Sequence, residues 1–292
     1  MTVFLKTIRV YQWPKNLVVL VALVFAQQFH EPTQVIRSLI ALIAFCAASS
    51  ACYIVNDLLD IENDRKHPVK CKRPLPSGAI TARGAITIAC LMGAIAAGLS
   101  CWLGIPFLAA VAAYVTLVMS YSLALKHQPI LDVLILALGF VVRAIAGALA
   151  LGVAFSNWLV VCTLFLALFL ALGKRRNELD SMEDDAHAHR AVLIHYSVPY
   201  LDALILIMAC STLLTYTIYT CSPEVVARLG TDKLYITVPF VVYGLFRYLY
   251  LIQLHEGGGD PSRTLLQDKP LMATVIAWGG ACVAILLVGK SQ

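Results

Sequence analysis

The sequence predicts an all-α membrane protein that crosses the bilayer several times. Of its 292 residues, 60% are hydrophobic and only 13% are charged, and the mean hydropathy is +0.81. A soluble domain averages about 45–50% apolar and about 25% charged residues. This composition excludes an ordinary soluble protein and leaves too little polar sequence for a separate soluble domain. We therefore expect a single integral-membrane domain over residues 1–292.

Nine apolar segments are candidate spans, because a helix that crosses the hydrocarbon core needs about 20 mostly apolar residues. They cover residues 16–29, 35–56, 84–103, 106–124, 131–152, 156–173, 200–220, 234–252 and 271–289. The first is short and is expected to extend back into Tyr11–Asn16. The third and fourth are separated only by Gly104-Ile105-Pro106, which is typical of a tight turn.

The basic residues predict the orientation. Sixteen Lys and Arg residues lie on the side that carries the N-terminus and the long loops, and four lie on the other side: Arg37, Arg228, Lys233 and Lys290. By the positive-inside rule, the N-terminus and the long loops face the cytoplasm. Arg143 falls inside an apolar segment, where it is expected either to form an ion pair or to line a path for lipid.

The most informative stretch is 56–64, where the second apolar segment meets water. Asn56, Asp60 and Asp64 are spaced i, i+4, i+8, so on a helix their side chains share one face. Carboxylate and amide oxygens suit Mg²⁺, which also retains water and phosphate ligands. Acids this close repel one another unless a cation lies among them. The stretch therefore predicts a Mg²⁺ site, and the alternative is a solvated helix end.

A basic loop, residues 65–78, follows the acidic stretch directly. Lys and Arg side chains there, among them Lys72 and Arg73, can bind the phosphates that a Mg²⁺ ion leaves unneutralised. A basic loop could instead hold anionic lipid headgroups. That alternative accounts for the cations but not for the ordered acids before them.

These residues carry a family resemblance. The pattern N-D-x-x-D-x-x-x-D, followed by H-P and then R-P-x-x-S-G, resembles the UbiA superfamily of membrane prenyltransferases. The resemblance covers nearly the whole chain. It implies nine helices around a central cavity open to the cytoplasmic side, with Mg²⁺ and a diphosphate at the mouth.

A second motif departs from the main family, in which an aspartate-rich motif follows the sixth span. Here Asp180 and Asp184 keep the D-x-x-x-D spacing, but three cations, residues 174–176, precede them. Gln12-Trp13-Pro14-Lys15-Asn16, this Gly-Lys-Arg-x-x-Glu-Leu run and Leu266–Leu271 resemble one branch, the decaprenyl-phosphate phosphoribosyltransferases. Within the last run, Asp268 and Lys269 are expected to order the loop.

The resemblance implies a reaction and a place for it. In that branch, 5-phosphoribose passes from 5-phosphoribosyl pyrophosphate to a polyprenyl phosphate and pyrophosphate leaves, with Mg²⁺ as cofactor, for cell-envelope glycan synthesis. The site would lie on the cytoplasmic side of the bacterial inner membrane. Membrane lipids are expected partners, nucleic acid is not, and a homo-oligomer remains open.

The site residues that follow fall into three groups. Asp60, Asp64 and Lys174 are expected to be catalytic, and Asn56, Asp60 and Asp64 to bind the metal. The predicted substrate-binding residues are Gln12, Lys15, Asn56, Lys72, Arg73, Tyr121, Lys126, Arg175 and Glu178. Lys174 and Arg175 would hold a second phosphate, with Glu178 either orienting them or bonding a ribose hydroxyl. Gln12 and Lys15 would meet the lipid phosphate.

Several alternatives stay open. A prenyl diphosphate donor that alkylates an aromatic or lipid acceptor shares the first motif, but the cation run at 174–176 argues against it. A transporter for an anionic solute would place its polar residues at the membrane midplane, whereas here they gather on one side. Asp132 is expected to pair with Lys126. His187 and His189 form either a weak transition-metal pair or part of a solvated loop.

Overall fold

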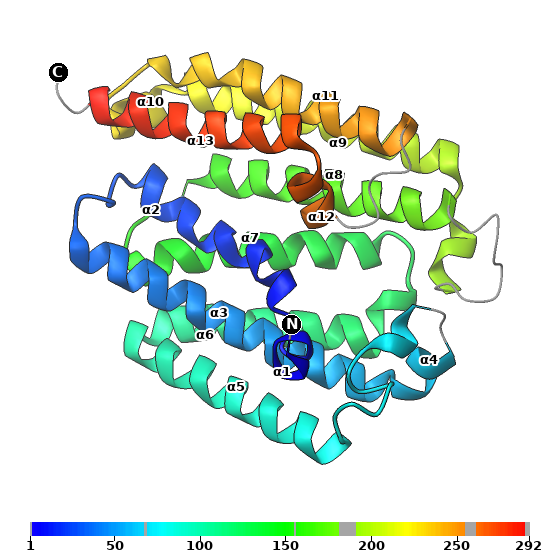
Figure 1. Ribbon diagram of the computed structural model, residues 1–292. Helices are drawn as coiled ribbons and strands as arrows, with labels where there is room; N and C mark the ends of the chain where they lie inside the picture. Colours follow the sequence, from blue (N-terminus) through cyan, green and yellow to red (C-terminus); the bar gives the residue numbers. More distant parts are fainter. Residues whose placement is uncertain (1, 67–68, 155, 181–190, 255–260, 290–292) are drawn as a thin grey trace.

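The chain folds into an all-helical bundle in the computed structural model (Figure 1). The structure describes every residue except 1, 67–68, 155, 181–190, 255–260 and 290–292, and no strand occurs among the described residues. The all-α prediction is thereby confirmed. Asp184, His187 and His189 lie outside the described residues, so the second aspartate of the D-x-x-x-D pair and the histidine pair stay predictions.

Eight described helices are long and apolar enough to cross a membrane. Seven of them are α3 (Pro32–Leu59), α5 (Ala82–Leu103), α6 (Ile105–Leu123), α7 (Leu131–Leu151), α8 (Asn157–Asp180), α9 (Val198–Cys221) and α13 (Lys269–Gly289). The eighth joins the 3₁₀ turn η5 (Lys233–Thr237) to α11 (Val238–Leu254). Short helices complete the chain: α1 (Val3–Thr7), α4 (Ile61–Lys66), η2 (Lys70–Lys72), η3 (Leu125–His127), η4 (Ala191–His195), α10 (Pro223–Leu229) and α12 (Pro261–Gln267).

The first predicted span has a different form, and the expected count of nine is not confirmed. Residues 10–25 fold as a 3₁₀ helix, η1 (Val10–Leu20), followed by a short α-helix, α2 (Val21–Phe25). A 3₁₀ helix rises about 2.0 Å per residue, so the two together reach about 30 Å, close to the hydrocarbon thickness. Sixteen residues can thus cover a distance that an α-helix covers with twenty.

Local sequence explains where several spans begin and end. The Thr81 hydroxyl accepts a hydrogen bond from the Gly84 N–H at 3.1 Å and caps α5. Gly104, with φ 114°, forms the tight turn expected between α5 and α6, a conformation that only glycine adopts readily. Pro residues occupy the first turn of α3, α6 and α9, where a missing N–H costs nothing.

Helices α3 and α7 form the interior of the bundle. About 61% of the apolar window of each is buried, against 17–33% for the other six. Phe45 of α3 packs edge-on against Phe107 of α6, with ring centroids 5.8 Å apart. On α7, a Cβ at Gly147 would lie 2.1 Å from the Val19 carbonyl oxygen, so only glycine lets η1 pack this closely.

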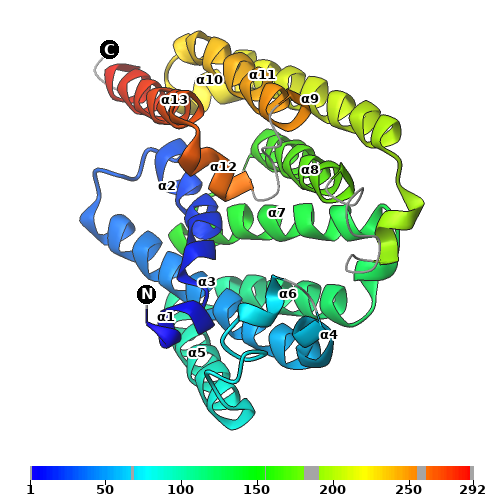
Figure 2. The ribbon, with the colours of Figure 1, turned by 45° about the vertical axis from the view of Figure 1, so that its right-hand side comes forward.

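The two ends of the bundle differ in character. The C-terminal end of α3, α4 and the N-terminal end of α7 lie at one end, whereas α2 and α10 lie at the other (Figures 1 and 2). Charged side chains that pair with one another gather at the first end, where α8 also finishes. Helix α8 continues to Asp180, so the predicted loop after the sixth span begins seven residues later than 173 and Lys174–Asp180 are helical.

Candidate functional site

The first acidic motif keeps helical geometry although α3 gives way to α4 within it. The Asp60 N–H donates to the Asn56 carbonyl at 3.0 Å, and the Asp64 N–H donates to the Asp60 carbonyl at 2.8 Å. Asp60 and Asp64 therefore each keep one i to i+4 backbone hydrogen bond at the junction. As a result the Asn56 side-chain amide donates to the Asp60 carboxylate at 3.2 Å, as the spacing predicts.

Cations from distant segments hold the carboxylates of this motif. Lys126 Nζ lies 2.9 Å from Asp60 Oδ1, and Arg73 Nη1 lies 2.6 Å from Asp64 Oδ2. Lys126 sits on η3, 66 residues further along the chain than Asp60. Lys126 and Arg73 are both predicted site residues, and the structure brings them to the acidic motif.

Two residues that sequence reasoning missed complete this cluster. Asp57 is buried, and its carboxylate pairs with Arg9 and, at 3.1 Å, with Arg73. Arg73 thus bridges Asp57 and Asp64. Arg9 has a left-handed backbone, φ 52°, at the junction of α1 and η1, which turns the start of the chain toward the motif. We call Arg9, Asn56, Asp57, Asp60, Asp64, Arg73 and Lys126 the first cluster.

The donor set of the first cluster fits a hard divalent cation. Mg²⁺ takes one or two carboxylates and fills its octahedron with water and substrate phosphates. Asn56 and Asp60 each carry a side-chain oxygen, their side chains are in contact through the Asn56 amide nitrogen, and the Asp60 side chain is 25% exposed. Among the residues described, no three His, Cys, Asp or Glu side chains converge on one point. Asp64, 5% exposed and paired with Arg73, lies deeper, and its role as a ligand stays a prediction.

The basic loop is ordered around the first cluster. The Ser77 N–H donates to the Arg73 carbonyl at 3.0 Å, and Gly78 takes φ 77°, which closes a turn. Lys70 Nζ approaches Asp64 at 3.9 Å. Lys72 lies exposed on η2, where it is accessible to a ligand.

A second cluster surrounds Arg175, whose side chain is completely buried. Its Nε donates to Asp132 Oδ2 at 2.7 Å, its Nη1 to Glu178 Oε2 at 2.6 Å and its Nη2 to the Tyr121 hydroxyl at 3.2 Å. Asp132 also has no exposed side-chain surface. A buried guanidinium is tolerated only with such partners. Arg175 therefore holds Glu178 and Tyr121 in place from beneath.

Tyr196, which sequence reasoning did not assign, anchors the other side of Asp132. Its hydroxyl donates to Asp132 Oδ1 at 2.8 Å and accepts the Ile130 N–H at 2.6 Å. Burial raises the pKa of Tyr196 to about 12, although the hydrogen bond from Ile130 works in the opposite direction. We call Tyr121, Asp132, Lys174, Arg175, Glu178 and Tyr196 the second cluster.

The expected Asp132–Lys126 pair is wrong. Asp132 pairs with Arg175 instead, and Lys126 pairs with Asp60. The two residues are six apart in sequence, but they flank the turn between α6 and α7 and face different clusters. Neighbouring charges need not pair when each has a better partner across the bundle.

Lys174 and Glu178 form the more accessible part of the second cluster. Lys174 Nζ lies 3.7 Å from Glu178 Oε1, one helical turn away, and their side chains are 33% and 25% exposed. Glu178 thus contacts both Lys174 and Arg175, and its role in orienting them stays a prediction. Asp180 pairs loosely with Arg176, at 3.5 Å.

Gln12 and Lys15 lie on η1, both half-buried. The neighbouring Trp13 indole donates to Ser50 Oγ of α3 at 3.1 Å and fixes this part of η1 against the bundle. Contact of Gln12 and Lys15 with a lipid phosphate stays a prediction.

Arg143, inside α7, has neutral partners rather than an ionic one. It donates to Asn16 Oδ1 at 2.8 Å, to the Tyr114 hydroxyl at 2.8 Å and to the Gly139 carbonyl at 2.9 Å. No carboxylate in the described part of the chain lies within 4.0 Å of it. Of the two expectations for Arg143, the ion pair is therefore wrong. Through these hydrogen bonds, Arg143 connects η1 and α6 to α7.

Asp268 orders the loop before α13, as expected. Its carboxylate accepts the Leu271 N–H at 2.8 Å and pairs with Arg247 of α11 at 2.8 Å. The hydrogen bond from Arg247 lowers the pKa of Asp268. The predicted ordering role of Asp268 therefore has a physical basis: it caps α13 and ties it to α11.

Curated relatives resemble this chain over almost its whole length. It is 30% identical to the decaprenyl-phosphate phosphoribosyltransferase of Mycolicibacterium smegmatis, over 97% of this chain and 92% of the relative. It is 31% identical to the enzyme of the same name from Corynebacterium glutamicum, over 94% of this chain and 83% of the relative. The Mycobacterium tuberculosis protein of that name is 30% identical over 96% of this chain and 93% of the relative.

Solved structures show the same fold. A UbiA homolog from Archaeoglobus fulgidus, bound to GPP and Mg²⁺, superposes with a TM-score of 0.72 at 18% identity, over 97% of this chain and 100% of that one. A digeranylgeranylglyceryl phosphate synthase gives 0.66 at 17% identity, over 97% of each chain. The model of the UbiA prenyltransferase family matches residues 16–267. This chain is therefore a helical membrane enzyme that belongs to the UbiA prenyltransferase family.

Proposed function

We propose that this protein transfers 5-phosphoribose from 5-phosphoribosyl pyrophosphate to a polyprenyl phosphate and releases pyrophosphate. The observation that carries the proposal is the identity of about 30%, over nearly the full chain, with enzymes named decaprenyl-phosphate phosphoribosyltransferases. The fold alone would not distinguish this reaction from prenyl transfer, because structural relatives below 20% identity include a protein solved with a prenyl diphosphate.

The charges of the two clusters support this choice of substrates. The reaction brings three phosphate-bearing groups together: the pyrophosphate, the 5-phosphate of the ribose and the lipid phosphate. The first cluster and its loop supply Lys70, Lys72, Arg73 and Lys126 for the pyrophosphate. The second cluster supplies Lys174, which a prenyl donor with a single diphosphate would not require.

The proposed chemistry needs no strong general base. A lipid phosphate oxygen is already anionic at neutral pH and attacks the anomeric carbon; the new C–O bond forms while the bond from that carbon to pyrophosphate breaks. Mg²⁺, when bound, would neutralise charge on the departing pyrophosphate. Asn56, Asp60 and Asp64 are the proposed ligands.

The residues around the leaving group then have distinct tasks. Lys126, 2.9 Å from Asp60, can turn to the phosphates when the donor arrives. Arg73 can keep its 2.6 Å contact with Asp64 and offer its remaining N–H groups to the phosphates. Lys174 would bind the 5-phosphate, and Tyr121 and Glu178 would position the ribose. Arg175 is a positioning residue in this scheme, because its buried side chain reaches Tyr121 and Glu178 rather than open space. Gln12 and Lys15 would meet the lipid phosphate.

We further propose that both clusters face the cytoplasm, the source of a soluble sugar phosphate. The excess of Lys and Arg at this end supports that orientation. We also propose that the protein lies in the bacterial inner membrane and that its product is used in the synthesis of cell-envelope glycans.

The test is a transfer assay with the purified protein, Mg²⁺, polyprenyl phosphate and radiolabelled 5-phosphoribosyl pyrophosphate. We expect label in the organic phase, and none with EDTA. Lys174→Ala should raise the KM for the donor about tenfold, because a charge-assisted hydrogen bond contributes about 1.5–3 kcal/mol. Lys6→Ala, an exposed cation outside both clusters, is the matched control. No transfer by the wild type, together with alkylation of an aromatic acceptor by a prenyl diphosphate, would overturn the proposal.

A further inference from the structure

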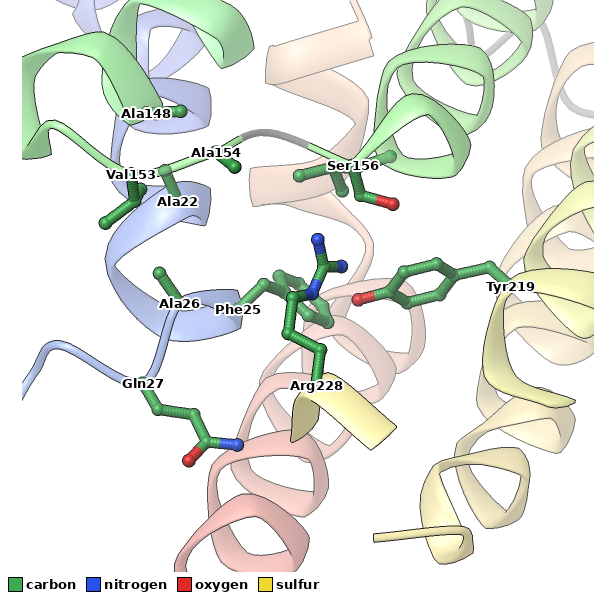
Figure 3. Close-up of a pocket in the computed structure, with 11 residues that line it drawn as sticks. Ala22, Phe25, Ala26, Gln27, Ala148, Val153, Ala154, Ser156, Tyr219 and Arg228 are labelled. Carbon is green, nitrogen blue, oxygen red and sulfur yellow. The ribbon is translucent and has the colours of Figure 1, made fainter. Parts of the chain in front are cut away.

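A cavity of about 330 Å³ lies at the end of the bundle away from both clusters. Its walls come from α2, from Val153, Ala154 and Ser156 between α7 and α8, and from α9 and α10 (Figure 3). The clusters lie at the C-terminal end of α3 and α8 and the N-terminal end of α7; this cavity lies at the opposite ends of α7 and α8. The proposed reaction does not use it.

The cavity combines apolar walls with a small polar group of side chains. Ala22, Phe25 and Leu159 contribute apolar surface, whereas Arg228, Tyr219 and Ser156 contribute donors. Figure 3 shows the Arg228 side chain directed into the space, with the Tyr219 hydroxyl pointing toward it. The cavity is therefore amphipathic.

Its polar groups lack protein acceptors. Tyr219 is 1% exposed, and its hydroxyl faces the Arg228 guanidinium, which can donate to the hydroxyl oxygen but cannot accept the hydroxyl proton. No acceptor for that proton lies within hydrogen-bonding distance among the described residues. A buried hydroxyl left unpaired is costly, so such groups are normally satisfied by a ligand or water. In the described part of the chain, no carboxylate lies within 4.0 Å of Arg228. A cation and an unused donor thus face the same space.

The position of Arg228 is fixed by the fold. Its neighbour Leu229 is buried, and the Leu229 carbonyl accepts a hydrogen bond from Gln27 Nε2 at 2.7 Å, across 202 residues. Leu229 and Val225 pack in one apolar cluster with Phe25 and Tyr219. Helix α10 is thereby docked on the end of α2, and Arg228 is carried to the mouth of the cavity.

We propose that this cavity binds the phosphate of an anionic glycerophospholipid from the surrounding membrane. A guanidinium and a hydroxyl are well-matched donors for a phosphate oxygen, and the apolar walls suit the glycerol and the first carbons of the acyl chains. The volume is roughly ten times the ~30 Å³ of a water molecule, room for a headgroup but not for a folded segment. The cavity lies at the ends of membrane spans, where lipid headgroups are found.

The test measures lipid binding to the full-length protein in neutral detergent, by native mass spectrometry and thermal shift. Phosphatidylglycerol is titrated against phosphatidylcholine, inorganic phosphate and polyprenyl phosphate. We expect phosphatidylglycerol to bind at least tenfold more tightly than phosphatidylcholine. Arg228→Gln should remove that preference, Arg228→Lys should retain part of it, and Tyr219→Phe should weaken binding about fivefold, as for one hydrogen bond of about 1 kcal/mol.

Lys233→Gln is the matched control, since Lys233 is an exposed cation close by in sequence that does not line the cavity. Equal losses in Arg228→Gln and Lys233→Gln would overturn the proposal, as would equal binding of phosphatidylcholine, or preferential binding of polyprenyl phosphate or inorganic phosphate. If Arg228→Gln fails to fold, Arg228→Lys and Tyr219→Phe decide the question. Phosphoribosyl transfer should stay within twofold of wild type in all these variants, so failure here is distinct from failure of the proposed function.

Discussion

The two charged clusters use the same residue types in opposite ways. In the first, Asp60 and Lys126 are 25% and 21% exposed, and Arg73 is shared between two carboxylates. In the second, the Arg175–Asp132 pair has no exposed side-chain surface. The Lys126–Asp60 pair of the first cluster can exchange partners with an arriving ligand. The Arg175–Asp132 pair of the second cluster cannot without exposing a buried charge. The partly exposed pair is thus able to change partners, whereas the buried pair is fixed.

Electrostatics explains this division. Exposed ion pairs contribute about 0–1 kcal/mol, so breaking one to bind a phosphate costs little. Removing one partner of a buried pair costs about 3–5 kcal/mol, because the other charge is left without compensation. A site that must admit a highly charged donor benefits from both kinds: weak pairs where the phosphates enter and a strong pair that keeps the surroundings in shape.

The largest expected effect comes from breaking the first cluster at Asp60. Asp60→Ala removes a proposed metal ligand and the partner of Lys126, and we expect the transfer rate to fall about 10³-fold or more. Steady-state transfer at saturating Mg²⁺ measures it. Glu62→Gln is the matched control within the same motif, since Glu62 is 73% exposed and contacts only Arg65 among described residues. Comparable losses in both variants would show that the motif acts through its overall charge.

The second cluster should respond in stability. Asp132→Asn leaves Arg175 without its buried carboxylate, and we expect the free energy of unfolding to fall by about 3 kcal/mol. Unfolding in mixed micelles measures this change. Asp180→Asn is the control: Asp180 is 49% exposed and 3.5 Å from Arg176, so the loss should stay below about 1 kcal/mol. If Asp132→Asn is as stable as the control, the Asp132 carboxylate does not stabilise the second cluster.

The smallest effect at neutral pH concerns Tyr196. Its pKa is raised to about 12 in the folded protein, from about 10 in the unfolded chain, so folding favours the neutral hydroxyl. Its contribution to stability is therefore complete below about pH 10 and declines as pH rises toward 12. We expect unfolding measured between pH 9 and 11 to show a steeper alkaline loss in wild type than in Tyr196→Phe. Identical slopes would contradict this assignment.

The helices could be predicted well from sequence, because hydropathy alone decides which segments enter a bilayer. The fifth predicted span, 131–152, corresponds to α7 (Leu131–Leu151), and the third, 84–103, corresponds to α5 (Ala82–Leu103). Hydropathy does not distinguish a 3₁₀ helix from an α-helix, so the form of η1 could not be foreseen. Nor does it report that α8 continues through a charged stretch, where tertiary pairing stabilises it.

Contacts within the site could be predicted only between residues that are close in sequence. The Asn56–Asp60 contact follows from helical spacing. Asp132 and Arg175 are 43 residues apart, and Tyr196 is 64 residues beyond Asp132. No spacing rule relates them, and an aspartate at the start of an apolar segment gives no sign of which cation it will meet. The role of the buried Asp57 could not be predicted for the same reason, because its partner Arg9 is 48 residues away.

The turn between α6 and α7 connects the two clusters through a short stretch of backbone. Lys126 reaches Asp60 in one cluster, and six residues later Asp132 reaches Arg175 in the other. Between them, Ile130 has φ 69° and its N–H is fastened to Tyr196. Such a short segment has little slack, so a displacement of Lys126 must be absorbed within a few peptide units. Binding of a ligand to the first cluster should therefore change the rate of amide hydrogen exchange near Ile130, even when no second substrate is bound.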